Sequence, residues 1–164
     1  MKRKRSFRRA QAGFSLVELL IVIAIIGILA AVAIPQLLRA LGSGKETAVR
    51  ASLHTIHSNE SQYLTIRQRF GTLKELTAEG LLEPSYASGA PVNGYIYTSA
   101  PEVTQDTYCV QATRQTPNAG LKDYNLDQSG TIRFVESKTP SPVPCGQGTP
   151  LSAEAGAAPG AGAK

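Results

Sequence analysis

A single carboxylate, Glu18, lies inside an otherwise apolar stretch of 21 residues, 14–34. As a helix this stretch would be about 30 Å long, which matches the hydrocarbon core of a bilayer. An acid in such surroundings costs a few kilocalories or more, so it is a functional candidate by default. The chemistry it offers is pairing with a cation, and the stretch itself contains no Lys or Arg. The alternative is a protonated Glu18, or one that snorkels to the interface.

Other residues capable of chemistry are few. His54 and His57 have the i, i+3 spacing of a shared metal site, but no third ligand is evident, so we interpret them as solvated. Asp123 and Asp127 are weak Ca²⁺ candidates, together with the Ser129 hydroxyl. Their pattern falls well short of a calcium loop and favours a turn. The chain has no G-x-S-x-G, P-loop, H-E-x-x-H or C-x-x-C motif, and we expect no enzyme, no cofactor and no metal.

The chain has two cysteines, Cys109 and Cys145. An even count in a chain with a membrane-targeting head favours one disulfide in an oxidising compartment. In the chain-entropy model such a bridge contributes roughly 3–4 kcal/mol. The alternative is two unrelated free thiols.

The basic charge of the chain is concentrated at its N-terminus. Residues 1–13 carry six of the 17 Lys and Arg and none of the 12 Asp and Glu. The remaining 11 cations stand against 12 acids, a net side-chain charge of −1, so the isoelectric point of 9.4 reflects the N-terminal head. We interpret this head as a targeting device that stays cytoplasmic and orients the apolar segment. Nucleic-acid binding is therefore not predicted.

The apolar stretch continues into a second helical pattern. Pro35 removes a backbone donor and clashes with the preceding turn, so we expect it to bend the helix rather than end it. Residues 45–70 have apolar side chains at helical spacing, which predicts one face packed on a sheet. Glu46 and Arg50 are expected to form an i, i+4 pair on the wet side. The apolar positions are Val49, Leu53, Ile56, Tyr63, Ile66 and Phe70.

Shorter elements follow. Thr72 with Glu75 three residues later predicts a capping box at the start of a short helix, and Gly80 should stop that helix. Four stretches are typical of strands, namely 95–99, 107–113, 123–126 and 131–135, and residues 127–130 are typical of a hairpin turn. The fold class is α+β: one long N-terminal helix, with a protruding apolar half and an amphipathic half, packed on a three- or four-stranded antiparallel sheet.

The predicted boundaries divide the chain into four parts. These are a basic leader (1–13), an apolar transmembrane or assembly helix (14–41), a globular α+β domain (42–145) and a Gly/Ala/Pro-rich tail (146–164). The tail lacks apolar periodicity and is expected to be disordered.

The start of the apolar stretch resembles the class III signal of type IV prepilins and pseudopilins. A short basic leader ends in Gly13, Phe14 follows it, and Glu18 comes four residues later at the head of a long apolar run. The match covers about residues 13–36, and few proteins combine all four features. The long helix on a small sheet is similar to the pilin fold.

The resemblance implies a processing step and an assembly step. In the family a membrane-embedded aspartyl peptidase cuts after the glycine and then methylates the new amino terminus. Carried over, Gly13 is the last leader residue and Phe14 is the methylated N-terminus. Glu18 of an incoming subunit would meet the Phe14 ammonium of the preceding subunit and set the axial register of a growing filament.

The resemblance also implies partners and a location. The partners are the prepilin peptidase and methyltransferase, copies of this chain and related pilins, an inner-membrane assembly platform and the lipid bilayer. Before processing, the chain would be a single-pass protein of the inner membrane with a cytoplasmic N-terminus. Afterwards it would lie in a periplasmic or extracellular filament, as a structural subunit of a type IV pilus-like assembly.

Two alternatives stay open. The first is a pseudopilin of a type II secretion system: the short helix and hairpin are similar to that group, whereas the spacing of Cys109 and Cys145 resembles the C-terminal disulfide loop of pilins. The second is a secreted or periplasmic binding module whose ordinary signal is cut after the A-x-A pattern at Ala31 and Ala33. The apolar run before that pattern exceeds an h-region of 7–15 residues, and this reading leaves Glu18 without a role.

Overall fold

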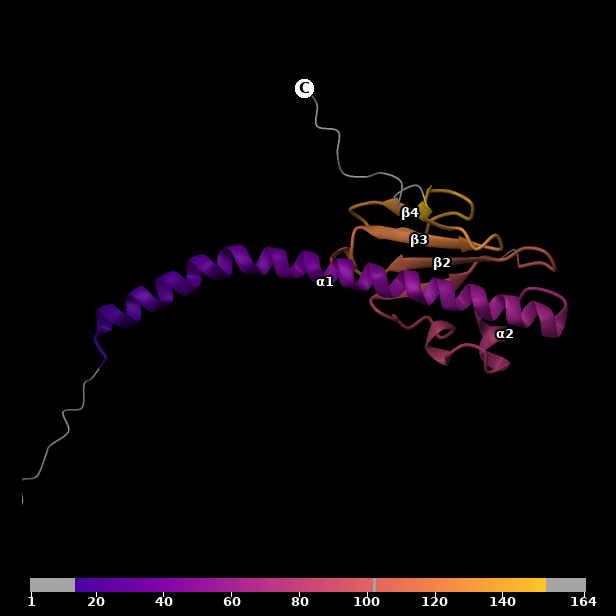
Figure 1. Ribbon diagram of the computed structural model, residues 1–164, viewed down its shortest axis with the longest axis horizontal. Helices are drawn as coiled ribbons and strands as arrows, with labels where there is room; N and C mark the ends of the chain where they lie inside the picture. The colour runs from indigo at the N-terminus through magenta and orange to yellow at the C-terminus, as the bar shows by residue number, and fades with distance from the viewer. Residues whose placement is uncertain (1–13, 102, 153–164) are drawn as a thin grey trace, which may run out of the picture. The chain divides into compact units, whose positions relative to one another are not determined.

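The computed structural model describes residues 14–101 and 103–152 (Figure 1). Two helices, α1 (Leu16–Arg67) and α2 (Leu73–Ala78), precede the strands, with a 3-10 turn η1 (Pro84–Tyr86) between α2 and the sheet. The strands are β1 (Tyr95–Ser99), β2 (Cys109–Arg114), β3 (Lys122–Asp127), β4 (Ile132–Glu136) and β5 (Thr149–Pro150), with a second turn η2 (Pro117–Ala119) before β3. They form one antiparallel sheet in sequential order.

This architecture confirms the α+β prediction of a long N-terminal helix packed on an antiparallel sheet. The chain divides into two units, one that ends at Leu37 and one that begins at Leu38, and each is described by itself. The first unit contains the N-terminal part of α1. The second, the globular unit, contains the rest of α1 and the elements that follow it.

Helix α1 joins the two predicted helical stretches into one element of 52 residues. Its first backbone hydrogen bond runs from the Leu19 N–H to the Ser15 carbonyl at 3.2 Å. Pro35 lies inside the helix, in agreement with the expectation that it does not end it. A bend at Pro35 stays a prediction.

Within the globular unit, α1 lies across one face of the sheet (Figure 1). Four of the six apolar positions predicted for its packed face are in the core: Val49, Leu53, Ile56 and Tyr63. The prediction for Ile66 is wrong, because this side chain is 54% exposed. Phe70 packs against the core as expected, but it is half-buried and lies beyond the end of the helix. The helix ends at Arg67 and Gln68 adopts a left-handed φ of 57°, which turns the chain before the periodic pattern is complete.

Glu60 lies between Ile56 and Tyr63, where the apolar pattern skips a turn, and it is buried on the same face although it is an acid. It is fully buried, and its Oε2 accepts a hydrogen bond from the Gly71 N–H at 3.0 Å. Its Oε1 has no hydrogen-bond partner among the described residues. Loss of solvent raises the pKa of Glu60 to about 7, more than the Gly71 hydrogen bond lowers it. Glu60 thereby ties the α1–α2 connection to the core.

The predicted capping box is confirmed at α2. The Thr72 hydroxyl accepts a hydrogen bond from the Glu75 N–H at 3.3 Å, and the Glu75 carboxylate accepts one from the Thr72 N–H at 2.8 Å. Hydrogen bonds from the Arg69 guanidinium, which has the largest effect, and from the Thr72 N–H lower the pKa of the Glu75 carboxyl to about 2. Gly80 takes a φ of 74° shortly after the helix, which is the conformation of a terminating glycine.

The four predicted strands correspond to β1 to β4, with ends shifted by at most two residues. The β3–β4 hairpin closes through the Gly130 N–H and the Asp127 carbonyl at 3.0 Å, as the turn chemistry predicted. β5 was not predicted, since two residues that include a proline carry no strand pattern. It pairs with Arg133 and Phe134 of β4, so order extends into the start of the segment 146–164 that was expected to be disordered. Residues 153–164 lie outside the described part of the chain.

Arg114 is a buried cation at the end of β2. Its guanidinium donates to both carboxylate oxygens of Asp123, at 3.1 and 2.9 Å, and the two side chains are 0% and 2% exposed. It also donates to the carbonyls of Gly120 at 2.7 Å and Ser137 at 2.9 Å. The guanidinium charge is thus paired and hydrogen-bonded, as burial requires. Through these contacts Arg114 connects β2 with the segment before β3 and the segment after β4.

Replacing Arg114 with methionine would leave Asp123 as an unpaired buried carboxylate. We expect the free energy of unfolding to fall by roughly 3–5 kcal/mol. The measurement is urea unfolding of the full chain in detergent, followed by the near-UV circular dichroism of its tyrosines. The matched control is Arg67→Met, which removes an exposed ion pair with Glu79 and should change little because solvent already screens that pair. Equal losses in the two variants would contradict the role of Arg114.

Glu60 predicts a pH dependence of defined sign. The pKa of Glu60 is raised from 4.5 to about 7 in the folded chain, so protonation favours the fold. This contribution is complete below about pH 4.5 and is lost as the pH rises through about 7. Glu60→Gln keeps an acceptor for Gly71 and cannot ionise. Between about pH 4.5 and pH 8 the variant should therefore gain on the order of 3 kcal/mol relative to the wild type in urea unfolding. If the free energy of unfolding changes with pH in the same way in the two proteins, this prediction is wrong.

Candidate functional site

Phe14 and Glu18 lie at the start of α1. Phe14 precedes the helix and is exposed, and Glu18 is an exposed residue of the first helical turn. A carboxylate in the first turn interacts favourably with the positive end of the helix dipole. The predicted cleavage point cannot be followed further, because Gly13 lies outside the described residues. Both side chains are therefore exposed in the unit that contains them.

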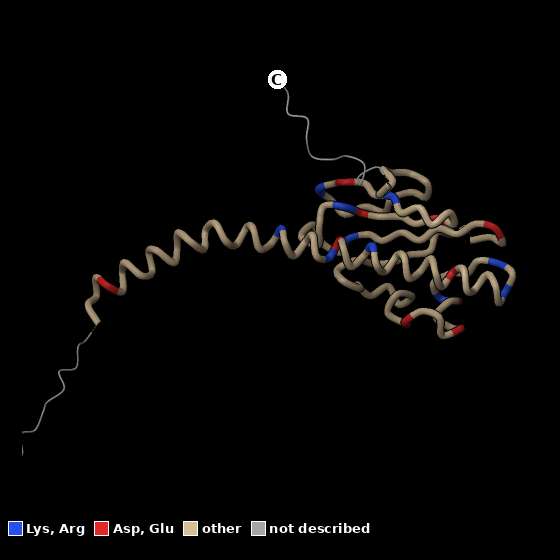
Figure 2. The backbone as a smooth tube through the Cα atoms, in the orientation of Figure 1, with Lys and Arg blue, Asp and Glu red and all other residues tan. Residues whose placement is uncertain are grey.

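The residues that follow Glu18 in α1 form an exposed apolar surface. Residues 19–38 contain no charged side chain, and none of the side chains from Leu16 to Leu37 is buried. Figure 2 shows this part of α1 almost free of charge, whereas charged residues are spread over the globular unit. α1 is long and apolar enough to cross a membrane. The exposed large side chains are Leu16, Val17, Leu19, Leu20, Ile21, Val22, Ile23, Ile25, Ile26, Ile28, Leu29, Val32, Ile34 and Leu37.

A surface of this kind needs a cover. Soluble monomers rarely expose contiguous apolar patches larger than a few hundred Å², and a helix that is apolar on all sides is normally buried in lipid or protein. The chain itself supplies no cover among the described residues. This helix, with Phe14 and Glu18 at its start, is the candidate functional site.

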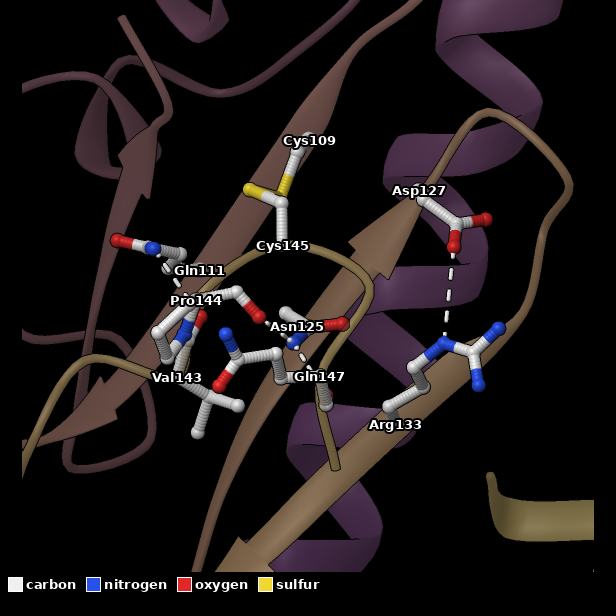
Figure 3. Close-up of a disulfide and its surroundings, with 9 residues drawn as sticks. All are labelled: Cys109, Gln111, Asn125, Asp127, Arg133, Val143, Pro144, Cys145 and Gln147. Carbon is white, nitrogen blue, oxygen red and sulfur yellow. Dashed lines mark hydrogen bonds and ion pairs between the residues drawn. A yellow bond between two sulfur atoms is a disulfide. The ribbon is translucent and has the colours of Figure 1, made fainter. Parts of the chain in front are cut away.

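The disulfide predicted between Cys109 and Cys145 is present (Figure 3). The two residues are 36 positions apart, and their Cα atoms are separated by 6.0 Å. Cys109 begins β2 and is buried, whereas Cys145 lies in the exposed segment between β4 and β5. The bridge therefore attaches the chain after β4 to the start of β2, an inner strand of the sheet.

Two amides hold the same segment beside the disulfide (Figure 3). Gln111 donates to the Val143 carbonyl at 3.0 Å, and Asn125 donates to the Pro144 and Gln147 carbonyls at 2.7 and 2.9 Å. Gln111 and Asn125 are paired across β2 and β3 and alternate with core residues, so they lie on the sheet face opposite α1. We call the disulfide and these amide contacts the C-terminal clamp.

The sequence did not reveal the clamp beyond its cysteines. Polar residues that alternate with apolar ones in a strand indicate a solvated face. Here that face is covered by residues 143–147, whose backbone carbonyls need donors. The one available signal was an amide in each of two neighbouring strands, Gln111 two residues after Cys109 and Asn125 in the next strand.

The suggested Ca²⁺ candidates do not converge. The Asp123 carboxylate is occupied by Arg114 and by the Ser141 N–H at 3.1 Å. Asp127 accepts from the Ser129 N–H at 3.0 Å and lies 3.7 Å from the Arg133 guanidinium. The two acids are four residues apart along β3, about 13 Å, so they cannot share an ion.

The two histidines have different surroundings. His57 Nδ1 shares a hydrogen bond of 2.6 Å with the Tyr108 hydroxyl, whereas His54 is exposed. In the part of the chain that the structure describes, no cluster of three or more His, Cys, Asp or Glu side chains is suited to a metal.

Comparisons with known proteins agree with this picture of the N-terminus. Residues 8–34 match the family described as the prokaryotic N-terminal methylation motif. The chain is 34% identical over 64 residues to the type IV major pilin protein PilA of Myxococcus xanthus, an alignment covering 39% of this chain and 29% of that protein. It is 51% identical over 55 residues to the type IV wide pilus major component PilA4 of Thermus thermophilus, covering 34% of this chain and 42% of that protein.

These similarities support the resemblance to type IV pilins that the N-terminal residues indicated. The chain spans less than half the length of either relative. What those proteins assemble into is therefore a basis for a proposal and not yet a property of this chain.

The C-terminal clamp predicts a large stability cost on reduction. In the chain-entropy model a loop of 36 residues corresponds to roughly 4 kcal/mol. We expect reductant to lower the free energy of unfolding of the wild type by about this amount in urea titrations. A variant with Cys109→Ser and Cys145→Ser is the control: it should start at the lower value and not respond to reductant. A wild type that is equally stable with and without reductant would contradict the prediction.

Proposed function

We propose, on the premise that the N-terminal segment of this chain is that of the type IV pilin family, that the protein is a structural subunit of a type IV pilus-like filament. The observation that carries the proposal is the uncovered apolar part of α1, headed by Phe14 and Glu18. The methylation-motif match over residues 8–34 and the two pilin relatives support it.

The proposed processing step removes the basic head. A prepilin peptidase cleaves between Gly13 and Phe14, and the new Phe14 amino group is methylated. The exposed position of Phe14 ahead of the first helical turn suits an enzyme that must reach this bond. Before the cut, the six cations of residues 1–13 hold the N-terminus on the cytoplasmic side of the inner membrane.

Glu18 gains its partner from this cleavage. The new ammonium at Phe14 is poorly placed at the positive end of a helix dipole, and a carboxylate in apolar surroundings is costly without a cation. We propose that Glu18 of an incoming subunit pairs with the Phe14 ammonium of the preceding one. One contact satisfies both charges and joins different surfaces of two copies, so it can repeat from copy to copy. A repeat whose rotation does not close into a ring produces a filament.

The apolar surface explains why assembly starts from a membrane. Extracting a 21-residue apolar helix into water would cost on the order of tens of kcal/mol. In the proposed cycle an inner-membrane platform moves the helix from lipid into a bundle of like helices. The apolar side chains then exchange one nonaqueous environment for another.

The test of this function combines processing and assembly in Glu18→Leu. We expect the variant to be cut at Phe14 and to carry one methyl group, about 14 Da by intact mass, yet to yield no filaments. The matched control, Glu83→Leu, removes an exposed acid of the globular unit and should assemble normally. Filaments formed by Glu18→Leu would exclude the register role. A mature N-terminus at Ile34, or an uncut Met1, would exclude the processing step.

The same preparation separates a pilus from the alternative, a type II secretion pseudopilus. Recovery of the processed chain in the sheared surface fraction indicates a surface pilus, and retention in the membrane fraction indicates a short periplasmic assembly. The pilus names of both relatives favour the first.

A further inference from the structure

Leu121 is an exposed apolar residue in a position that the filament role does not explain. It lies between η2 and β3 and is 64% exposed, more than any other large apolar side chain described from Leu38 onward. Single exposed leucines are common on protein surfaces. This one is notable because the structure holds its backbone firmly in place.

The backbone around Leu121 is fixed against α1. A Cβ atom on Gly42 would lie 3.5 Å from the Gly120 Cα, so the two backbones pack directly on each other. The Leu121 N–H donates a hydrogen bond to the Glu46 carboxylate at 2.7 Å. Glu46 makes this contact in place of the ion pair that was expected with Arg50. Leu121 therefore lies level with the helical turn that contains Gly42.

Leu121 borders two hollows, and each of them is also lined by a cation. Leu121 borders a hollow of about 370 Å³ together with Leu38 and Arg39 of α1. Leu121 also borders a second hollow, together with Lys138 and Glu136. The Glu136 carboxylate lies 3.7 Å from the Lys122 ammonium, and Glu46 is bound to the Leu121 N–H. Each acid near Leu121 thus has a partner, and the three cations Arg39, Lys122 and Lys138 outnumber the two acids Glu46 and Glu136 by one.

The depth of this surface follows from counting along α1. The 20 residues 19–38 reach about 30 Å as a helix, the thickness of the hydrocarbon core, and they are bounded by Glu18 and Arg39. If the core begins at Phe14 instead, Leu38 lies about 6 Å beyond its far edge, within the headgroup layer. In both cases Leu38 and Arg39 meet the lipid headgroups, and Leu121 borders the same hollow.

We propose that residues 117–121 form a membrane-seating surface for the phospholipid leaflet from which α1 emerges. In the unassembled precursor the Leu121 side chain enters the boundary between headgroups and acyl chains. Arg39 and Lys138 contact lipid phosphates around it, an arrangement of apolar tip and flanking cations that suits an anionic bilayer surface. This inference rests on the membrane-anchored precursor of the proposed function, and it assigns a surface of the globular unit to the lipid before assembly.

The test measures the lipid contact of single positions in the full chain. Leu121→Cys is labelled with bimane, with the native disulfide kept oxidised, and reconstituted in vesicles of phosphatidylethanolamine and phosphatidylglycerol that carry headgroup nitroxides. We expect quenching at least about twofold stronger than for labelled Ile66→Cys, since shallow insertion brings the probe to the nitroxide. Ile66 is a matched control: it is 54% exposed and lies 24 residues past Gly42 on α1, about 36 Å. Equal, weak quenching at Leu121 and Ile66 would overturn the inference.

Labelled Ala24→Cys, in the apolar part of α1, separates this inference from the proposed function. Quenching of Ala24 by acyl-chain nitroxides with none at Leu121 leaves the membrane anchor standing and rejects the seating surface. If neither is quenched, the membrane-anchored precursor itself is rejected. Quenching at Leu121 that falls as the protein-to-lipid ratio rises would assign the surface to a second copy instead of lipid.

The cations are tested in the labelled Leu121→Cys chain. Arg39→Gln with Lys138→Gln should weaken the quenching at Leu121 and remove its dependence on the phosphatidylglycerol fraction. Lys74→Gln removes an exposed cation from α2 and should leave that dependence unchanged. A dependence that persists in the double variant would reject the phosphate contacts.

Discussion

The structure depends on one constraint: the first part of α1 is apolar on all sides, and nothing in the described chain covers it. Two surroundings suit such a surface, a bilayer core and a bundle of like helices. In the proposed function the chain occupies the first and then the second, so water never becomes the solvent of this helix. The globular unit must therefore fold and persist in both settings without help from the apolar part.

The globular unit achieves this with buried polar groups that each hold an irregular segment to the core. Glu60 binds the backbone of the α1–α2 connection, Arg114 binds the segments around η2 and after β4, and the clamp amides bind residues 143–147. Loops carry backbone groups that lose water when they are packed, and each unsatisfied group costs about 1–3 kcal/mol. Glu60, Arg114 and the two clamp amides satisfy these groups, which explains why so small a sheet has polar side chains packed against it.

The sequence predicted what local rules determine, and it missed what tertiary contacts determine. The Thr72 capping box, the alternation of β1 to β4 and the N-terminal signal each have a local cause, and the fold and the recognition follow from them. The burial of Glu60 was missed because a search for apolar residues at helical spacing passes over an acid on the buried face. The helix end at Arg67 was missed because Gln68, not a glycine, takes the left-handed conformation. The turn preferred at residues 127–130 is present, whereas the contact of Asp123 with Arg114 was not foreseen because no spacing reveals it. At the candidate site the pairing of Cys109 with Cys145 is confirmed, and the roles of Phe14 and Glu18 stay predictions.

The two energies at the N-terminus of α1 differ in size and in what they specify. Burial of the apolar surface amounts to tens of kcal/mol but is proportional to area and has no direction. A slip of one helical turn, 5.4 Å, between two such helices changes the buried area by a small fraction, so area alone leaves the register open. The same slip separates a carboxylate from its ammonium and strands both charges in apolar surroundings, at a cost of several kcal/mol per ion. In the proposed filament the smaller interaction would therefore select the register, while the larger one would hold the helices together. That division of labour requires Glu18 to be the lone acid in its stretch, because a second one would offer a competing register.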